Sequence, residues 1–296
     1  MAAYTAVDLS RLPAPAIVEE LDFDTIYADM RARLLALLPD FDATVESDPA
    51  VKILQVAAYS ELLIRARIND AARSLMVAYA TGADLDNLAA LFGVARFLID
   101  AGDPQHGLAP TYESDADLRR RLVLAPEGYS VAGPVGAYIF HALSADADVL
   151  DASVASPTPG RVVVTVLSRT GDGTAPPALV DAVAAYCSAD TRRPITDEVI
   201  VQGAAIVPFA VTATLTFFPG PDAAIVTATA QARLADYLAE SHRLGRDITR
   251  SGLFAALHVE GVQNVTLVSP AADLVIADHQ AAWCTGVTLT SGGTAE

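Results

Sequence analysis

Residues 47–82 read SDPAVKILQVAAYSELLIRARINDAARSLMVAYATG, and no helix breaker follows Pro49 until Gly82. The triplet Ser47-Asp48-Pro49 supplies a capping side chain and a proline suited to the first helical turn. This stretch predicts one helix over about 49–80, roughly 45 Å long at 1.5 Å per residue. Such a length exceeds that of a usual globular helix and indicates a bundle or coiled coil made with partners.

The apolar face of this predicted helix is wide and does not follow a strict heptad, while Arg65, Arg67, Asp70 and Arg73 mark its wetter side. A broad apolar stripe is typical of a helix that is buried against other helices. We therefore predict that its apolar side chains form a partner interface. The predicted interface residues are Ile53, Leu54, Leu62, Ile64, Ile68 and Leu75.

Helical patterns also flank this stretch. Asp22 and Asp24 begin a segment with apolar residues at three-and-four spacing, which ends before Pro39, and we expect one stripe of it to be buried. A short helix is predicted from Asp84 onward. Residues 100–110 are rich in glycine and proline and lack periodicity, so they predict a linker and a domain boundary.

Beyond the linker the pattern becomes mixed. It predicts helices near 134–145, 177–186 and 222–240, and strands near 149–155, 161–167, 196–201 and 206–218. The sequence VLDASVASP at 149–157 is echoed by VQNVTLVSP at 262–270, and a short apolar helix precedes each. Either the echo is a chance match or it marks two related modules.

The predicted fold class is therefore α+β, with a helical N-terminal region followed by two small α+β modules. The predicted domains are a helical domain with the long helix over 1–105, a middle α+β domain over 106–203 and a C-terminal α+β domain over 204–296.

Composition excludes several classes of protein. The net charge is −17 and Lys52 is the only lysine, which argues against a nucleic-acid binder. Residues 199–221 are uncharged, but Pro208 and an alternating pattern predict a half-buried strand, so we expect no membrane segment. Residues 1–15 lack a long apolar core, so we expect no signal peptide. Cys187 and Cys284 form no C-x-x-C pair, which favours folding in a reduced cytoplasm.

The search for catalytic chemistry finds little. No two histidines share a metal-ligand spacing, and no G-x-S-x-G elbow or phosphate loop occurs. His279 and Cys284 could form a Cys–His nucleophile pair, although no glycine turn for an oxyanion hole adjoins the cysteine. Five D-x-D pairs lie mostly where helices start or loops turn, which favours capping. These pairs are Asp22/Asp24, Asp40/Asp42, Asp84/Asp86, Asp115/Asp117 and Asp146/Asp148.

We therefore expect a protein that is not an enzyme and has no cofactor and no metal. The alternative is a carboxylate-dependent cell-wall hydrolase, because the pairing of catalytic carboxylates is spatial and cannot be read from one sequence. A third hypothesis is a receptor-binding module, but the chain has few aromatics, 6%, and lacks fibre-like repeats.

In its order of motifs the sequence resembles the baseplate assembly protein J family of contractile-tailed phages, prophage remnants and tailocins. The strings that carry the resemblance cover nearly the whole chain. They are VDLSRLP at 7–13, ELLIRARINDAAR at 61–73, ATGADLDNLA at 80–89, DLRRR at 117–121, GPVGAY at 133–138, VLDA at 149–152, GRDIT at 245–249 and GVQNV at 261–265.

This resemblance implies a structural wedge protein with no catalytic pattern. It implies that two copies join one copy of baseplate protein I, partly through a helical bundle. Six such wedges would form a ring around the hub and tail-tube proteins, near the sheath-initiating wedge protein, and the ring would help to trigger sheath contraction. The implied location is the tail baseplate of a virion or tailocin, assembled in the host cytoplasm, with no nucleic acid or membrane as partner.

Overall fold

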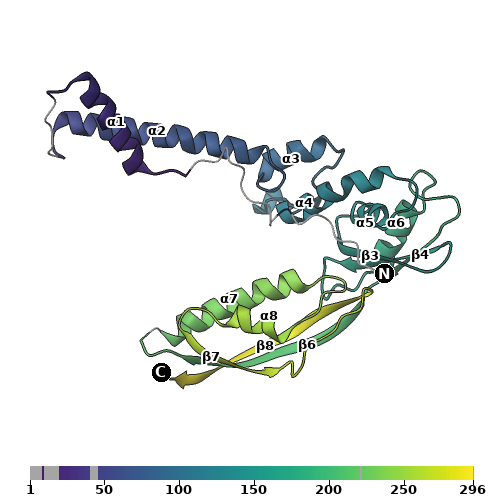
Figure 1. Cartoon of the computed structure of the whole chain (residues 1–296). Helices are drawn as coiled ribbons and strands as arrows, with labels where there is room; N and C mark the ends of the chain where they lie inside the picture. Colours follow the sequence, from purple (N-terminus) through teal and green to yellow (C-terminus); the bar gives the residue numbers. More distant parts are fainter. Residues whose placement is uncertain (1–8, 10–19, 41–45, 221, 296) are drawn as a thin grey trace. The chain divides into compact units, whose positions relative to one another are not determined.

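The computed structural model of the chain describes residues 9, 20–40, 46–220 and 222–295. Residues 1–15, for which we expect no signal peptide, lie outside this described part except for Leu9. The described residues divide into two compact units: those up to Arg96 with Ser114–Val123, and Phe97–Glu113 with those from Leu124 onward (Figure 1). Within the described residues, no helix is both long and apolar enough to span a bilayer.

The first unit is helical, as predicted. It contains α1 (Phe23–Leu37), α2 (Pro49–Ser74), α3 (Gly82–Ala90) and most of α4 (Asp115–Leu124), and α1 packs against α2. The carboxylate of Asp22 caps α1 by accepting hydrogen bonds from the backbone N–H groups of Asp24 and Thr25. The carboxylate of Asp48 accepts from the N–H of Ala50 at the start of α2, so the predicted capping of both helices is confirmed.

The end of α2 differs from the prediction, because the helix stops at Ser74 and not near residue 80. The guanidinium of Arg119, on α4, donates to the carbonyl oxygens of Val77 and Ala80 at 2.7 and 2.6 Å. These bonds hold residues 75–80 in turns, and the partner lies some forty residues away in sequence. A contact over that separation cannot be predicted from the local helical pattern.

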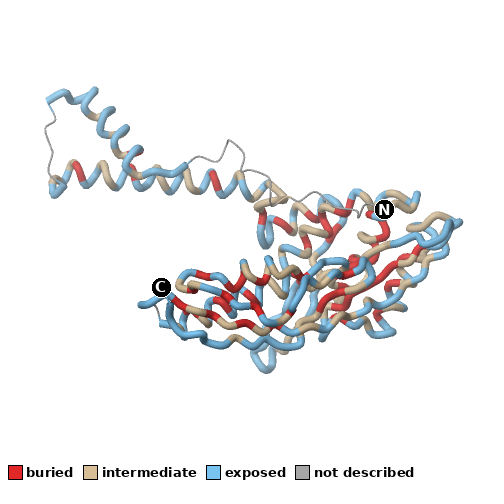
Figure 2. Tube along the Cα trace, turned by 60° about the horizontal axis from the view of Figure 1, so that its bottom comes forward, coloured by how far each residue is buried: buried red, intermediate tan, exposed pale blue. Residues whose placement is uncertain are grey.

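Few side chains of α1 and α2 are buried. Ile26 is the buried residue of α1, and α2 buries Val51, Ala58 and Asn69. The expected apolar stripe of α1 is buried only in part, since Phe23, Tyr27, Met30 and Leu34 are half-buried beside Ile26. Leu37 is 80% exposed. Figure 2 shows both helices largely in the colour of exposed residues. The pair formed by α1 and α2, which we call the hairpin, therefore leaves much of its apolar surface in contact with water.

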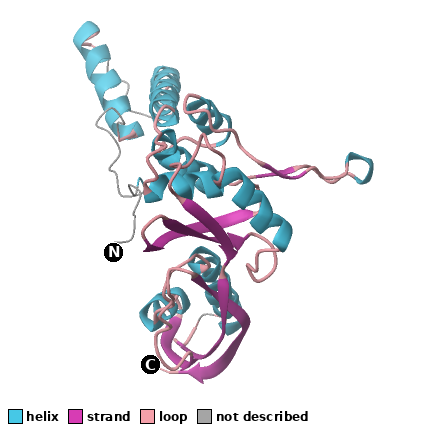
Figure 3. Cartoon of the chain, turned by 90° about the vertical axis from the view of Figure 1, so that its right-hand side faces the viewer, coloured by secondary structure: helices cyan, strands magenta, loops and turns pink. Residues whose placement is uncertain are grey.

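The second unit begins with a narrow ribbon where the sequence predicted a linker. Strands β1 (Leu98–Asp100) and β2 (Thr111–Tyr112) pair antiparallel, with the short helix η2 (Pro104–His106) between them (Figure 3). Gly102 has a positive φ, and a Cβ there would lie 2.4 Å from the carbonyl oxygen of Leu108. The glycine that suggests a linker is thus needed for a tight turn.

The remainder of the second unit holds two α+β modules, and the predicted α+β class is confirmed. The middle module contains η3 (Ala125–Tyr129), α5 (Val135–Leu143), β3 (Val149–Thr158), β4 (Arg161–Ser168), α6 (Pro177–Cys187) and β5 (Glu198–Gly203). The C-terminal module contains β6 (Ala205–Phe217), α7 (Ala223–Ser241), α8 (Arg250–Leu257), β7 (Val262–Ser269) and β8 (Gln280–Thr294).

The two sheets share one arrangement of strands. The orders are β3-β4-β5 and β7-β6-β8, and in each sheet the central strand has one antiparallel and one parallel neighbour. The echoed segments form β3 and β7, which both follow a helix and both run antiparallel to the central strand. The central strand follows its antiparallel neighbour in the middle module and precedes it in the C-terminal one, so the chain order of the two modules is different.

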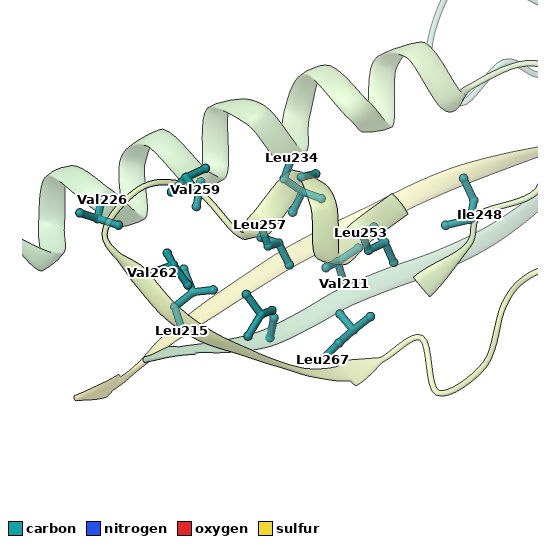
Figure 4. Close-up of a cluster of buried hydrophobic side chains, with 14 of the residues drawn as sticks. Val211, Leu215, Val226, Leu234, Ile248, Leu253, Leu257, Val259, Val262 and Leu267 are labelled. Carbon is teal, nitrogen blue, oxygen red and sulfur yellow. The ribbon is translucent and has the colours of Figure 1, made fainter. Parts of the chain in front are cut away.

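The C-terminal core is formed by the alternation along β6. Val211, Ala213, Leu215 and Phe217 are all buried and face α7 and α8 (Figure 4). The intervening residues Thr212, Thr214 and Thr216 lie on the other face of the sheet, as a period of two requires. One face of this sheet is therefore covered by helices.

A buried carboxylate links the two modules. Asp151, on β3, is 4% exposed, and its carboxylate accepts from the backbone N–H of Leu244 at 2.9 Å and of Ala152 at 2.8 Å. The hydroxyl of Ser153 donates to the carbonyl oxygen of Asp278 at 2.6 Å. These bonds join residues more than ninety positions apart and fix β3 against the segment that follows α7.

His141, on α5, is buried without a hydrogen-bond partner for either ring nitrogen among the described residues. Its ring lies against Phe140 and Tyr186, and Arg192 lies over the Tyr186 ring. Burial lowers the pKa of His141, and the positive charge of Arg192 lowers it further. The neutral imidazole is therefore the form that the folded middle module accommodates.

We expect this histidine to destabilise the chain at acidic pH. The unfolded chain takes up the proton near the ordinary pKa of about 6.5, whereas the folded chain resists it. The contribution of His141 to the free energy of unfolding is therefore fully present above about pH 6.5. As the pH falls below that value, the free energy of unfolding decreases by at most about 1.4 kcal/mol per pH unit for one proton. His141→Leu should flatten this dependence in thermal unfolding between pH 7 and 5. The exposed-site control His279→Leu should keep the wild-type slope, and an unchanged slope in His141→Leu would contradict the assignment.

Candidate assembly interface

Six large apolar side chains remain exposed, five on one side of α2 and one, Leu75, at its C-terminal cap. At 3.6 residues per turn the five on α2 lie on the side opposite to Val51, Ala58 and Asn69, the buried residues of the helix. We name the six the α2 outer stripe. Its members are Ile53, Val56, Leu63, Ile64, Ile68 and Leu75, each between 52% and 75% exposed.

The predicted interface residues divide between the two sides of α2. Ile53, Ile64, Ile68 and Leu75 belong to the α2 outer stripe. Leu54 and Leu62 are half-buried on the side that carries Val51 and Ala58, the side that is buried within the chain. Two members, Val56 and Leu63, are absent from the prediction, although helical spacing could have located them, since Val56 follows Ile53 by three residues and Leu63 follows Val56 by seven.

Exposed apolar side chains also occur at the end of α1. Leu37 is 80% exposed and Leu38, at its C-terminal cap, is 55% exposed. Large exposed apolar side chains that cluster on a free chain mark a protein interaction site. Full burial of one leucine or isoleucine side chain contributes about 1.5–3 kcal/mol. The hairpin can therefore supply a large part of the free energy of association with another protein.

Several acids of the D-x-D pairs make structural contacts. Asp22 caps α1, Asp146 accepts from the N–H of Asp148, and Asp148 accepts from the hydroxyl of Ser168. Asp42 lies outside the described residues. These contacts fit the predicted capping and turn roles.

Asp86 and Asp115 come from two different pairs and meet at one arginine. Each carboxylate lies 2.7 Å from a guanidinium nitrogen of Arg96, and Asp115 also accepts from the N–H of Gly82. Burial alone would raise the pKa of Asp115, but the hydrogen bonds from Arg96 and Gly82 outweigh it and lower the pKa. Asp115 is thus held as an anion that ties α3 to α4.

The hydrolase alternative requires two carboxylates that face each other across a cleft. A pocket of about 410 Å³ lies between α7 and α8, and the acids that line it are Asp236 and Glu240. Both lie on α7, one turn apart, so they share one wall of the pocket. This geometry does not provide the opposed pair that glycoside hydrolysis uses.

The proposed Cys–His pair is likewise not assembled. The thiol of Cys284 lies 3.4 Å from the carbonyl oxygen of Gly286. The histidine beside this segment is His242, whose Nδ1 lies 2.8 Å from the carbonyl oxygen of Ala282 and whose ring meets Trp283 edge-on. Burial raises the pKa of the other thiol, Cys187, to about 12. In the described part of the chain, no three His, Cys, Asp or Glu side chains are grouped to hold a metal ion.

Comparison with known proteins gives matches along the chain. Three family profiles match in order: Baseplate J-like N-terminal domain at residues 46–103, Baseplate J-like central domain at 130–203, and Baseplate J-like protein C-terminal domain at 209–290. The chain is 45% identical over 300 residues to "Baseplate protein J" of Escherichia phage P2, with 98% of this chain and 99% of that protein covered.

Among solved structures, the chain is similar to one from the six-fold symmetrised cryo-EM structure of the anti-feeding prophage baseplate. The TM-score is 0.39 and the identity 14%, with 62% of this chain and 43% of that chain covered. The chain thus spans less than half the length of that protein.

Proposed function

The chain belongs to the baseplate J-like family, and we infer that it acts as a wedge subunit of a contractile tail baseplate. At the coarser level, it is a structural protein of the phage tail baseplate, it associates with other baseplate proteins, and it is not an enzyme. The finer assignment to a wedge, with its stoichiometry and partners, is our proposal.

We propose that two copies of the chain join one copy of baseplate protein I. Six such wedges form a ring around the hub and the tail tube, next to the sheath-initiating wedge protein. A change in the diameter of this ring on host contact then helps to start sheath contraction.

The observation that carries the proposal is the α2 outer stripe. Five exposed apolar side chains on one side of a 26-residue helix, with a sixth at its C-terminal cap, are costly in a chain that works alone, because a partner could remove each from water. A helical bundle with helices of a second copy and of baseplate protein I covers such a stripe without any change to α2.

Co-expression with baseplate protein I tests this proposal. We expect the two proteins to purify together, with two copies of this chain in each complex. The hydrolase alternative has no support from the carboxylates discussed above, which lie in a helix cap, a turn, an ion pair and one wall of a pocket.

A further inference from the structure

The last strand of the chain, β8, is an unusually long edge strand. It spans 15 residues, where strands of globular proteins usually have about 5–6. In the order β7-β6-β8 it pairs with β6 on one side only. On its other side, within the described residues, an isolated bridge joins Leu244 to Ala281, and no strand pairs beyond it. The imidazole of His242 occupies the carbonyl oxygen of Ala282. From Trp283 to Thr294 this outer side, which we name the β8 edge, presents backbone groups that can accept another strand.

The β8 edge lacks charged residues and proline, two of the features that protect exposed strands from pairing. Irregularities in its pairing with β6 occur after Cys284 and after Ser291, so its regular part is residues 286–291. Residues 280–294 contain no lysine, arginine, aspartate, glutamate or proline, which are the residues that natural edges use to prevent association. The opposite edge, β7, is only 8 residues long and is flanked by Glu260 and Pro270. Val287, Thr288, Leu289 and Thr290 in the middle of β8 also favour the extended conformation. The β8 edge is therefore suited to accept a β-strand.

The distribution of charge indicates which strand would pair with the β8 edge. The chain has 36 acidic and 19 basic residues, so two copies repel each other over most of their surfaces. None of these charged residues lies in β6, β7 or β8. A basic partner would gain nothing from an uncharged edge, whereas a second copy can approach there without bringing carboxylates together. The occupant that fits is an uncharged, extended strand, and β8 of another copy has both properties.

We propose that the β8 edges of two copies pair antiparallel across a two-fold axis and form a continuous six-stranded sheet. Such an interface is self-complementary, because the same residues contribute from both sides. On the open face of each sheet the hydroxyl groups of Thr214 and Thr290 lie 2.9 Å apart, so hydroxyl pairing between neighbouring strands already occurs on that face. This contact goes beyond the proposed function, since it uses no residue of the α2 outer stripe.

Disulfide trapping on the full-length chain tests the pairing. Single cysteines are placed at residues 287, 288, 289 and 290 in a Cys284→Ser background. The control is Val268→Cys on β7, because Val268 is also on this sheet and is 60% exposed. Cysteines can bridge when their Cα atoms lie about 4.4–6.8 Å apart, a spacing found next to the two-fold axis of an antiparallel pair. We expect a cross-linked dimer that is strongest at one or two adjacent β8 positions and absent at residue 268.

A charge substitution gives a second readout that does not depend on trapping. Thr288→Lys brings two lysines together near the axis and should weaken self-association in sedimentation roughly tenfold, because like charges on opposed strands are unfavourable. Thr266→Lys on β7, which lies on the same open face, should leave it unchanged, and both variants should unfold at the same temperature. Equal cross-linking at β7 and β8, no cross-link at any β8 position, or trapping to a different protein in the co-expressed complex would overturn the proposal.

Discussion

Replacing Ile64 and Ile68 with aspartate should abolish co-purification with baseplate protein I while leaving the purified chain folded. Both side chains are more than half exposed, at 61% and 54%, so the free chain loses little packing. In the proposed complex partner helices cover the same positions, so an aspartate there must either lose its hydration or hold the helices apart. The variant therefore separates assembly from folding.

The expected size of this effect follows from the apolar area. Each isoleucine contributes about 2 kcal/mol when it is fully buried, so two contribute about 4 kcal/mol, which corresponds to roughly a thousandfold in affinity. A loss of this size is easily seen as the disappearance of the complex in size-exclusion chromatography. The thermal unfolding temperature of the chain alone should change little, because exposed substitutions usually stay within about 0.5 kcal/mol.

A matched control is the double variant Ile225→Asp/Val275→Asp. These residues are 67% and 81% exposed, lie in the second unit and give the same change in charge and number of apolar side chains. This double variant should still bind baseplate protein I. If both double variants bind, or if both fail, the α2 outer stripe is not the surface that recognises the partner.

The second large effect is expected from Leu215→Ala in the C-terminal module. Leu215 is fully buried in the middle of β6, between Val265 on β7 and Ser291 on β8. Truncation of a leucine in such a position removes about 2–5 kcal/mol of stability, through lost burial and the cavity that remains. For a unit of this size that corresponds to a fall of about 5–15 °C in the midpoint of thermal unfolding.

Val268→Ala on β7 is the control for this prediction. Val268 lies on the same sheet but is 60% exposed, so its truncation should change stability by no more than about 0.5 kcal/mol. Calorimetry on the three proteins gives the comparison. A midpoint for Leu215→Ala within 1–2 °C of the control would mean that this module does not depend on the core in Figure 4.

Local signals predicted the parts of the fold that local interactions determine. The starts of α1 and α2 follow from Asp22, Asp48 and Pro49, because a cap and its helix are neighbours in sequence. The end of α2 does not, since Arg119 holds the segment after it from another helix. The ribbon of β1 and β2 was likewise predicted as a linker, because two- and three-residue strands are too short for a period to be seen.

The candidate interface could be predicted only in part for a similar reason. The sequence identified α2 as a helix with more apolar surface than one chain can bury. It could not tell which apolar side faces α1, and so it grouped Leu54 and Leu62 with Ile53 and Ile64. The β8 edge carries no motif, and its importance follows from the strand order, which places β8 outside β6.

The measurement that tests the wedge assignment most directly is the mass of the complex obtained by co-expression with baseplate protein I. Native mass spectrometry should give one copy of baseplate protein I with two copies of this 30.8 kDa chain. The Ile64→Asp/Ile68→Asp chain, co-expressed in the same way, should give no complex. A wild-type chain that stays monomeric and binds no baseplate protein would contradict the account.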